Sequence, residues 1–268
     1  MRKIYFVEVE RVLNEYLFNE IHERSKKYKY TSMNYIDFDD CKNATIICND
    51  DKLILLHDKT KSPSMLYFAV NTFNDLLKIL VDIPGKLRLH FVPKEYALSL
   101  SKLGFSEWGE YVDFWNDNLA TMAIHITNID NCNYLVEHEC EYVAALSQKC
   151  KLQSRGFEGE TAEWFANWLR ENKVIVLRAH TVIVGFCCVS IYNEGTTLWI
   201  REIAVDPEHQ GMGLGKKLME QAIRYGVECG ATKGFLAADI LNKNAIGLYN
   251  KYNYFAKGSD SELQMIKE

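Results

Sequence analysis

A glycine-rich turn between an apolar strand and a helix is the first stretch of this chain that could do chemistry. Residues 198–205 are apolar, Asp206-Pro207 ends that run, and the sequence then reads Gln210-Gly211-Met212-Gly213-Leu214-Gly215 before a helix-like segment, 216–229. Glycines allow a tight turn, and the first turn of a helix leaves backbone N–H groups without intrahelical partners. With the helix dipole, these donors predict an anion site suited to a diphosphate.

The glycine spacing excludes two common phosphate loops. It is neither the dinucleotide pattern G-x-G-x-x-G nor the nucleoside-triphosphate pattern G-x-x-x-x-G-K-[ST]. Lys216 and Lys217 at the end of the turn add positive charge. The structural alternative is a flexible connection between a strand and a helix.

A second motif lies downstream, at Asn242-Lys243-Asn244-Ala245-Ile246-Gly247-Leu248-Tyr249. The turn, Gln-x-x-Gly-x-Gly after Val-x-Pro, resembles the acyl-CoA pyrophosphate loop of the GNAT (Gcn5-related) N-acetyltransferase superfamily. The second motif is similar to Asn-x-x-Ala-x-x-Leu-Tyr of that family. Asn253-Tyr254 departs from the Gly-Phe that commonly follows, although Asn also tolerates a left-handed helix end.

This resemblance implies that acetyl-CoA is the co-substrate and that no metal takes part. It implies transfer of an acetyl group to a primary amine of a small molecule or peptide through a direct ternary complex. The residues that it assigns to acetyl-CoA are Ile203, Ala204, Val205, Gln210, Gly211, Met212, Gly213, Leu214, Gly215, Lys216, Asn242, Ala245 and Tyr249.

Tyr249 and Glu202 are the expected catalytic residues. Tyr249 stands where the family places a phenol near the thioester sulfur, and a phenol can act as a general acid. Glu202 lies inside an otherwise apolar strand, where an acid is unusual, and is the candidate base, directly or through water. The alternatives are a plain core aromatic for Tyr249 and a salt bridge with Arg201 for Glu202.

The resemblance also predicts how the strands are arranged. The strand that ends near Val205 and the strand 234–240 should be parallel and should splay apart after a bulge. The gap would admit the pantetheine arm, which would pair with the backbone of 203–205 like an added strand.

The first half of the chain contains a similar order of predicted strands and helices, and one segment of it resembles the second motif. Residues 94–105, ending Lys-Leu-Gly-Phe, can be laid against 243–254, ending Lys-Tyr-Asn-Tyr, so that Pro93 and Leu100 take the places of Asn242 and Tyr249. We therefore expect an α+β protein of two parts. The first part, 1–117, is a non-catalytic, degenerate GNAT-like domain or else an unrelated α+β cap. The second, 118–268, is a catalytic GNAT domain with a mixed central sheet flanked by helices.

Several elements follow from local patterns. Strands are predicted at 44–48, 53–57, 65–70, 87–92, 110–115, 121–127, 174–178, 182–192, 196–205 and 234–240. Helices are predicted within 5–28 and at 71–80, from Pro93 to near Gly104, and at 137–150, 159–172 and 216–229. Asn116-Asp117-Asn118 is the predicted linker.

Residues near the helix 159–172 are candidates for the acceptor site. Trp164, Phe165, Trp168 and Leu169 share one face of that helix, which fits either core packing or an aromatic wall. Arg155, in the preceding loop, fits either a contact with an acidic group or a solvated surface position.

Composition narrows the class of protein. A hydrophobic content of 48% and a charged content of 25% are those of an ordinary globular chain. A net charge of −5 with no long basic run argues against a nucleic-acid partner. No apolar run is long enough for a membrane span, and the first residues lack a signal-peptide pattern. The scattered cysteines fit a reducing cytoplasm and form no metal-ligand spacing.

We therefore expect a cytoplasmic N-acetyltransferase, monomeric or homodimeric, with an amine acceptor and no membrane partner. The alternatives are an acyl-CoA-binding sensor or scaffold without turnover, and a homodimeric interaction protein built on an inactive fold.

Overall fold

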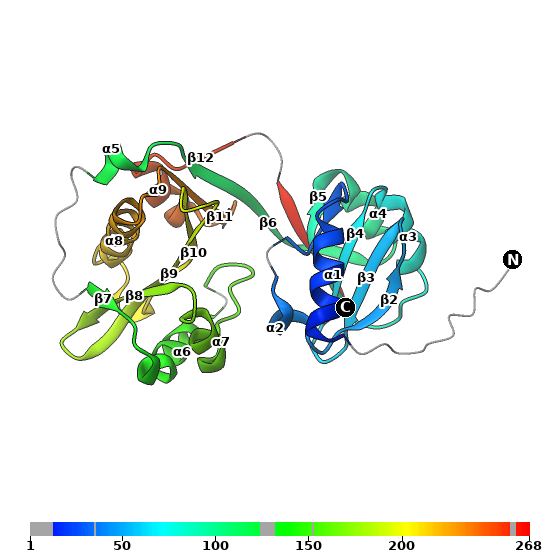
Figure 1. Cartoon of the computed structure of the whole chain (residues 1–268), viewed down its shortest axis with the longest axis horizontal. Coiled ribbons are helices and arrows are strands. Elements are labelled where there is room, and N and C mark those ends of the chain that lie inside the picture. Colours follow the sequence, from blue (N-terminus) through cyan, green and yellow to red (C-terminus); the bar gives the residue numbers. More distant parts are fainter. Residues whose placement is uncertain (1–12, 35, 124–131, 152, 258–260) are drawn as a thin grey trace, which may run out of the picture. The chain divides into compact units, whose positions relative to one another are not determined.

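The chain divides into two compact units. The computed structural model describes residues 13–34, 36–123, 132–151, 153–257 and 261–268. Unit 1 contains residues 1–110 and 260–268, and unit 2 contains 111–259 (Figure 1). The sequence placed the division after residue 117, whereas contacts place it after Glu110 and assign the C-terminal segment to the first unit. The roles predicted for the two parts remain predictions.

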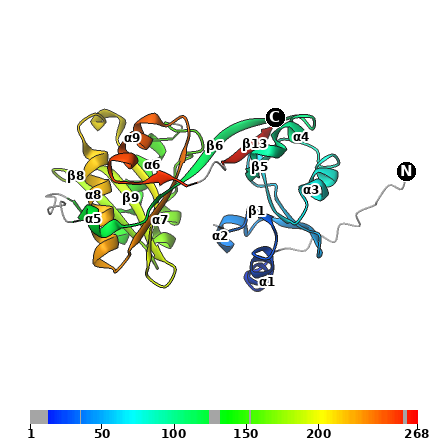
Figure 2. The same ribbon diagram turned by 90° about the horizontal axis from the view of Figure 1, so that it is seen from above.

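Unit 1 consists of a sheet with helices on both faces. Its elements are α1 (Glu15–Ser25), β1 (Tyr30–Thr31), α2 (Phe38–Cys41), β2 (Thr45–Asn49), β3 (Leu53–Asp58), β4 (Ser64–Val70), α3 (Phe73–Leu80), β5 (Leu87–Pro93), a 3-10 turn (Lys94–Tyr96), α4 (Ala97–Ser101), the first half of β6 (Phe105–Asn116) and β13 (Glu262–Lys267). Figure 2 shows α3 and α4 on one side of this sheet and α1 and α2 on the other.

Alternation along the strands of unit 1 explains its two cores. In β3, Leu53 and Leu55 pack with α3 and α4, whereas Ile54 and Leu56 pack with α1 and α2. Successive side chains of a strand point to opposite faces, so a strand covered on both faces reads as an unbroken apolar run. All six residues of β3 are buried accordingly.

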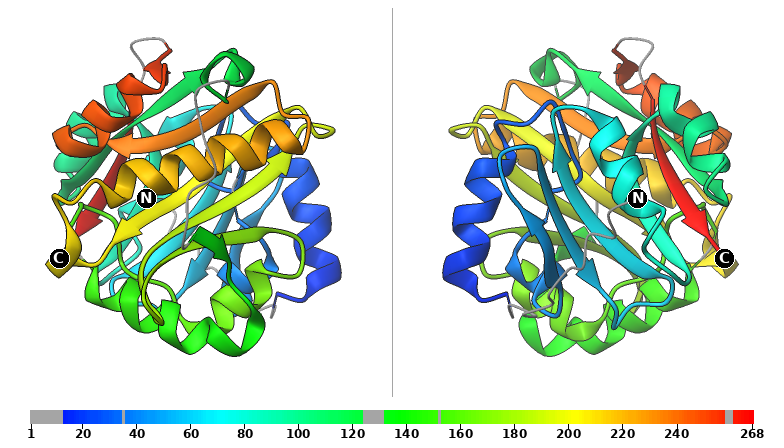
Figure 3. Two further views of the ribbon diagram at one scale, coloured as in Figure 1. Left: turned by 90° about the vertical axis from the view of Figure 1, so that its left-hand side faces the viewer. Right: turned by 90° about the vertical axis from the view of Figure 1, so that its right-hand side faces the viewer.

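Unit 2 repeats this architecture. Its elements are the second half of β6, α5 (Leu119–Ala123), β7 (Cys132–Tyr134), a 3-10 turn (Glu137–Glu139), α6 (Cys140–Lys149), α7 (Ala162–Trp168), β8 (Lys173–Ala179), β9 (Val182–Tyr192), β10 (Thr197–Val205), a 3-10 turn (Pro207–His209), α8 (Leu214–Glu228), β11 (Lys233–Asp239), α9 (Lys243–Lys251) and β12 (Phe255–Ala256). The strand order is β6-β11-β10-β9-β8-β7, and β12 also pairs with β6. Figure 3 shows α8 crossing one face of this sheet.

The two faces of this sheet have separate cores. Side chains from α5, α8 and α9 form one core with the sheet, and side chains from α6 and α7 form the other. The pairings are antiparallel except that of β10 with β11, which is parallel.

Most predicted elements are present, and three differ. The hairpin of β2 and β3 is confirmed, and so is β9. The strand predicted at 121–127 is wrong for 121–123, which end helix α5; residues 124–127 lie outside the described residues. The predicted linker is wrong at Asn116, which is buried in β6 and donates a hydrogen bond to the Tyr252 carbonyl at 2.7 Å. Helix α7 is shorter than predicted because Gly159 takes a left-handed conformation before it.

Membrane insertion by a helix finds no support in the fold. Among the described residues, no helix is both long and apolar enough to cross a bilayer.

Candidate active site

The central strands of unit 2 part from each other half-way along. Strands β10 and β11 pair in parallel at three positions, the last of which joins Trp199 to Phe235. Beyond it, β10 continues to Val205 and β11 to Asp239 with no further register between them. The backbone edge of β10 over 203–205 therefore faces a gap, as the sequence predicted, and an open edge can pair with an extended ligand.

A bulge in β10 reverses which residues of the strand face each side of the sheet. The pairing with β9 shifts register between Ile200 and Glu202. Before the bulge, Leu198 and Ile200 pack in the core under α8; after it, Ile203 and Val205 do so. An inserted residue reverses the face of everything beyond it. Glu202 consequently points to the opposite face, the one covered by α6 and α7.

The glycine-rich turn adopts the conformation that its glycines permit. Gly211 and Gly213 have φ angles of 77° and 75°, in the left-handed region. A Cβ at either position would meet no atom within 4 Å, so backbone conformation, and not packing, requires glycine there. Gly213 is the N-cap of α8 and supplies no side-chain cap. The helix therefore begins with N–H groups available to an anion.

Side chains hold this turn from below. Gln210 donates from Nε2 to the Val205 carbonyl at 3.1 Å and to Gln153 Oε1 at 2.6 Å. Asp206 accepts from the Glu208 N–H at 3.0 Å and lies 2.9 Å from the Lys149 ammonium. Burial alone would raise the pKa of Asp206, but the bonds from Lys149 and the Glu208 N–H hold it below its ordinary value.

The other residues assigned to the turn divide between its exposed side and the core. Met212 is 66% exposed, and Lys216 is exposed with its ammonium 3.7 Å from the Glu220 carboxylate. Leu214 packs partly against the core under α8, and Gly215 faces Leu248 from helix α9. With their open N–H groups and left-handed glycines, these residues fit a diphosphate.

The second motif forms the start of α9. Asn242 Oδ1 accepts from the Ala245 N–H at 3.1 Å, which makes Asn242 the N-cap of that helix. Asn and Asp are preferred caps because they satisfy an N–H that the helix leaves open. Ala245 packs against the core under α8. Asn253 has a φ of 58°, the left-handed conformation that its place in the motif predicts.

Tyr249 is a core residue of α9. It is only 6% exposed, and its ring lies 6.2 Å from that of Phe114. Burial raises the pKa of Tyr249 far above its ordinary value, so its phenol stays protonated at neutral pH. The core interpretation of this residue is thus correct, and it is compatible with a role as proton donor.

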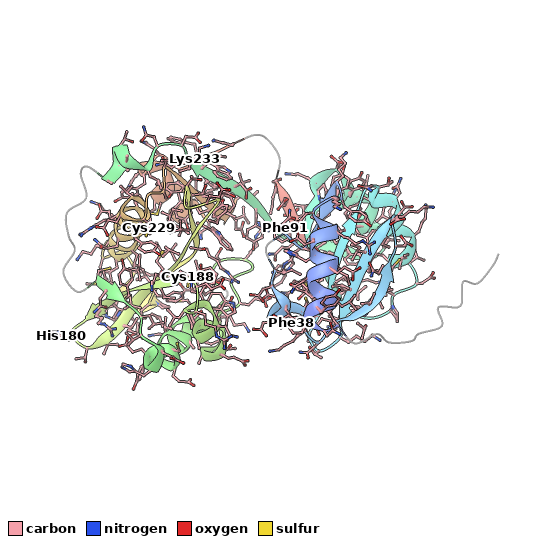
Figure 4. The ribbon with its side chains drawn as sticks, viewed as in Figure 1. Phe38, Phe91, His180, Cys188, Cys229 and Lys233 are labelled. Carbon is pink, nitrogen blue, oxygen red and sulfur yellow. The ribbon has the colours of Figure 1, made fainter. Side chains whose placement is uncertain are left out.

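Glu202 is buried on the other face. Burial raises the pKa of Glu202, and Arg201 together with a hydrogen bond to Glu160 offsets only part of that rise. Its Oε2 atom is buried and has no hydrogen-bond partner among the described residues. In Figure 4, Cys188, which lies opposite Glu202 in the register of β9, marks this part of the sheet.

The predicted salt bridge between Arg201 and Glu202 is present but long, and Arg201 also has closer partners. The Arg201 guanidinium lies 4.3 Å from the ring centre of Trp164, and its Nη2 is 3.3 Å from Glu160 Oε1. Its Nε is 3.9 Å from Glu202 Oε1, at the limit of an ion pair. The closer partners of Arg201 are therefore Trp164 and Glu160.

The aromatic residues of α7 lie in two environments. Phe165 is fully buried and packs edge-on against Phe186. Trp164 and Trp168 stack at 5.2 Å and lie beside Arg201. The core interpretation is confirmed for this face, since Phe165 lies in the core and Trp164, Trp168 and Leu169 pack against it. The aromatic wall for an acceptor stays a prediction.

Arg155 is half-buried and pairs with an acid of its own chain. Its guanidinium binds Asp239, the last residue of β11, through Nε–Oδ2 at 2.7 Å and Nη2–Oδ1 at 2.8 Å. Sequence analysis missed Asp239. The available signal was an acid at the end of an apolar strand.

The two predicted catalytic residues thus lie on opposite faces of one sheet. Tyr249 belongs to the face covered by α8 and α9, and Glu202 to the face covered by α6 and α7. The gap between β10 and β11 connects these faces, so only a molecule threaded through it could meet both. Among the described residues, no group of His, Cys, Asp or Glu side chains could hold a metal ion.

Residues 133–254 match the family model described as the acetyltransferase (GNAT) family. These residues are a GNAT domain. Streptothricin acetyltransferase from Streptomyces lavendulae is 32% identical to this chain over 108 residues, which cover 40% of this chain and 53% of that protein. Spermine/spermidine N(1)-acetyltransferase from Bacillus subtilis is 28% identical over 96 residues, 32% of this chain and 63% of that protein. The chain spans about half the length of the curated relatives it matches.

The likeness in fold extends beyond the GNAT domain. A GCN5-related N-acetyltransferase from Sphaerobacter thermophilus superimposes with a TM-score of 0.61 at 14% identity, over 84% of this chain and 80% of that one. This overlap includes part of unit 1, to which the family model does not extend. The predicted fold, a mixed sheet flanked by helices with a GNAT domain in the second half, is confirmed.

Proposed function

We propose that this protein is an N-acetyltransferase that transfers an acetyl group from acetyl-CoA to a primary amine within a ternary complex. The observation that carries this proposal is the gap between β10 and β11, together with the glycine turn at the start of α8. The GNAT domain and the curated relatives, each named as an acetyltransferase, support it.

The acetyl-CoA diphosphate would bind the N–H groups of the turn over 211–216. The pantetheine arm would lie in the gap and pair with the backbone of Ile203–Val205 as an added strand. Binding both substrates in this way makes the reaction effectively unimolecular, which can lower the barrier by about 7–11 kcal/mol.

In the reaction, the reacting ammonium group first loses one proton to solvent, and the neutral amine nitrogen then attacks the thioester carbonyl carbon so that a C–N bond forms. The C–S bond then breaks and its electron pair leaves on sulfur. The amine proton passes to the Glu202 carboxylate, directly or through water, and the Tyr249 hydroxyl donates a proton to the sulfur. The raised pKa of Glu202 makes its carboxylate a stronger base than an exposed one.

The acceptor that we propose is a cationic amine, either a small molecule or a peptide. Two carboxyl groups, Glu160 and Glu202, and the indole rings of α7 already surround one cation, the Arg201 guanidinium, so this part of the site suits positive charge. The curated relatives are named for spermine and streptothricin.

A second function, acyl-CoA binding without turnover, is favoured by the near-complete burial of Tyr249. A sensor of this kind would use the same gap and turn. It would not require Tyr249 or Glu202 to reach a bound thioester.

Calorimetric titration of acetyl-CoA into the wild type and into Gly213→Glu tests the proposal. We expect binding by the wild type and at least a tenfold loss in the variant, because a carboxylate would occupy the anion site. Gly195→Glu is the matched control, since Gly195 has a φ of 85° and open space but lies in the turn before β10. No binding by the wild type would contradict both functions. Binding without transfer to any amine in a broad panel would favour the sensor.

A further inference from the structure

The segment 153–155, here called the crossing segment, contacts the chain on both sides of the gap, next to the ends of β10 and β11. Gln153 Oε1 accepts a hydrogen bond of 2.6 Å from Gln210, which follows β10. Two residues later, Arg155 binds the carboxylate of Asp239 at the end of β11 through two hydrogen bonds. The crossing segment therefore spans the gap where the two strands are farthest from their last pair.

The crossing segment lies on the face of Glu202. In β11, Leu236 and Ala238 belong to the core under α8, so the side chain of Asp239 points to the opposite face. The bulge in β10 directs Glu202 to that same face. Arg155, on Asp239, is thus on the side where an acyl group would emerge from the gap.

Further contacts fix the crossing segment. The Tyr111 hydroxyl donates to the carbonyl of Arg155. The side chain of Asp239 is only 2% exposed, and its Oδ1 also accepts from the Leu241 N–H at 2.8 Å. A bidentate pair with one buried partner is geometrically rigid, and removing either partner leaves a buried charge.

We propose that the crossing segment limits the length of the acyl group that the site accepts, with Arg155 as the specificity-determining residue. The acyl chain extends beyond the thioester carbon, on the Glu202 face of the gap, towards the Arg155–Asp239 pair. An acetyl group ends before this pair, whereas a longer chain would have to displace it. This inference rests on the proposed function, because it requires the pantetheine arm to lie in the gap.

Calorimetry with acetyl-, butyryl- and hexanoyl-CoA tests this inference without requiring turnover. For the wild type we expect hexanoyl-CoA to bind at least tenfold more weakly than acetyl-CoA. A single extra methylene group that a pocket cannot accommodate already costs about 10–200-fold. In Arg155→Ala this ratio should fall to near one while the affinity for acetyl-CoA changes little. Arg155→Lys keeps a charge but only one contact, and should be intermediate.

Arg224→Ala is the matched control, because Arg224 pairs with exposed Glu228 on α8, away from the gap. Its acyl preference should equal that of the wild type. If Arg155→Ala does not fold, Asp239→Asn, which keeps the shape of the side chain, replaces it and should also lower the ratio. An unchanged ratio in folded variants would overturn the acyl-length inference alone. Failure of the wild type to bind any of the three thioesters would overturn the proposed function as well.

Discussion

Both units of the chain contain a pair of parallel strands that part after three residues. In unit 1, β4 and β5 pair from Ser64 and Leu87 to Leu66 and Leu89, just as β10 and β11 do in unit 2. In each unit, the first of these strands also pairs with the strand before it, and a helix follows it. The two gaps differ in what lies beside them.

In unit 1, the chain itself occupies the gap. Strand β1 pairs with β4 through Tyr30 to Val70, and the Ser32 N–H donates to the Phe68 carbonyl at 2.9 Å. The Ser32 hydroxyl in turn accepts from the Phe68 N–H at 2.8 Å. The other edge of β4 is paired along its length with β3, so β1 lies on the edge that faces β5. No described strand pairs with the equivalent edge of β10 beyond Trp199.

The connection after the first strand differs as well. In unit 1 only Asn71 and Thr72 join β4 to α3, whereas unit 2 has the turn 206–213 with its left-handed glycines. Among the described residues of unit 1, the edge of β4 that faces β5 is therefore covered, and no glycine-rich turn follows β4. The two units thus differ in two local features, the edge beside the parted strands and the turn that follows, while both have a sheet with a core on each face.

The largest expected effect is on catalysis by Tyr249→Phe. Loss of a general acid should lower kcat by about 10²–10⁴-fold with little change in acetyl-CoA affinity, because the ring and its packing remain. Steady-state kinetics measures this. Tyr96→Phe in unit 1, where Tyr96 stacks on Phe73, is the matched control and should keep kcat. Equal losses of kcat in both variants would contradict a catalytic role that belongs to unit 2 alone.

Glu202→Gln should lower kcat/KM by about 10²-fold or more and change its pH dependence. Wild-type kcat/KM should rise with pH through the pKa of Glu202, which burial places above the ordinary value of about 4.3, because the base must be ionised. The variant should lack this limb, whereas Glu228→Gln, an exposed change on α8, should retain it.

Glu202→Gln should lower activity but raise the stability of the fold at high pH. An acid with a raised folded pKa stabilises the fold while it is protonated, and this contribution is lost as pH rises from the unfolded to the folded pKa. Thermal unfolding should therefore show the variant to be more stable than the wild type at pH 8 but not at pH 4. A destabilised variant at pH 8 would mean that the ionised carboxylate is well satisfied.

Ser32→Ala tests whether β1 closes the gap beside β4 in unit 1. The change leaves the Phe68 N–H without its acceptor, so the free energy of unfolding should fall by about 1–3 kcal/mol in a denaturant titration. Wild type and variant should each bind one acetyl-CoA per chain with the same affinity. Ser101→Ala, an exposed change on α4, should cost much less. Two bound molecules per wild-type chain would contradict the closed gap in unit 1.

The smallest effect is expected for Asn242→Ala. Loss of the N-cap of α9 should lower the free energy of unfolding by about 1 kcal/mol, since the Ala245 N–H loses its acceptor. Asn244→Ala, an exposed change on the same helix, is the control. A similar loss for both would assign no special role to the cap.

Local patterns predicted the parts of the site that depend on neighbours in sequence. The glycine turn and the left-handed Asn253 both follow from short motifs. The motif that begins at Asn242 was also recognised, although its role as a helix cap was not predicted. The Lys-Leu-Gly-Phe echo was also informative, since Gly104 adopts the left-handed conformation at the position of Asn253. Such features are set within a few residues, where propensity and hydrogen bonding act directly.

Contacts between distant segments could not be predicted. The pair of Arg155 with Asp239 joins residues 84 positions apart, and no spacing rule relates them. The filling of the gap by β1 depends likewise on an edge that only the folded sheet creates. The helix over 119–123 was mistaken for a strand because its short apolar run fits both periodicities.

The pairing of β13 with β5 has a consequence for how the protein is made. Lys267 lies beside Leu87, so the sheet of unit 1 includes a strand that leaves the ribosome only after all of unit 2. At a synthesis rate of about 5–20 residues per second, the nascent first unit waits roughly 8–30 seconds with that edge of β5 uncovered. The strands of unit 2 follow one another in the chain from Tyr111 onward, so unit 2 can complete its sheet before the last strand of unit 1 has been made.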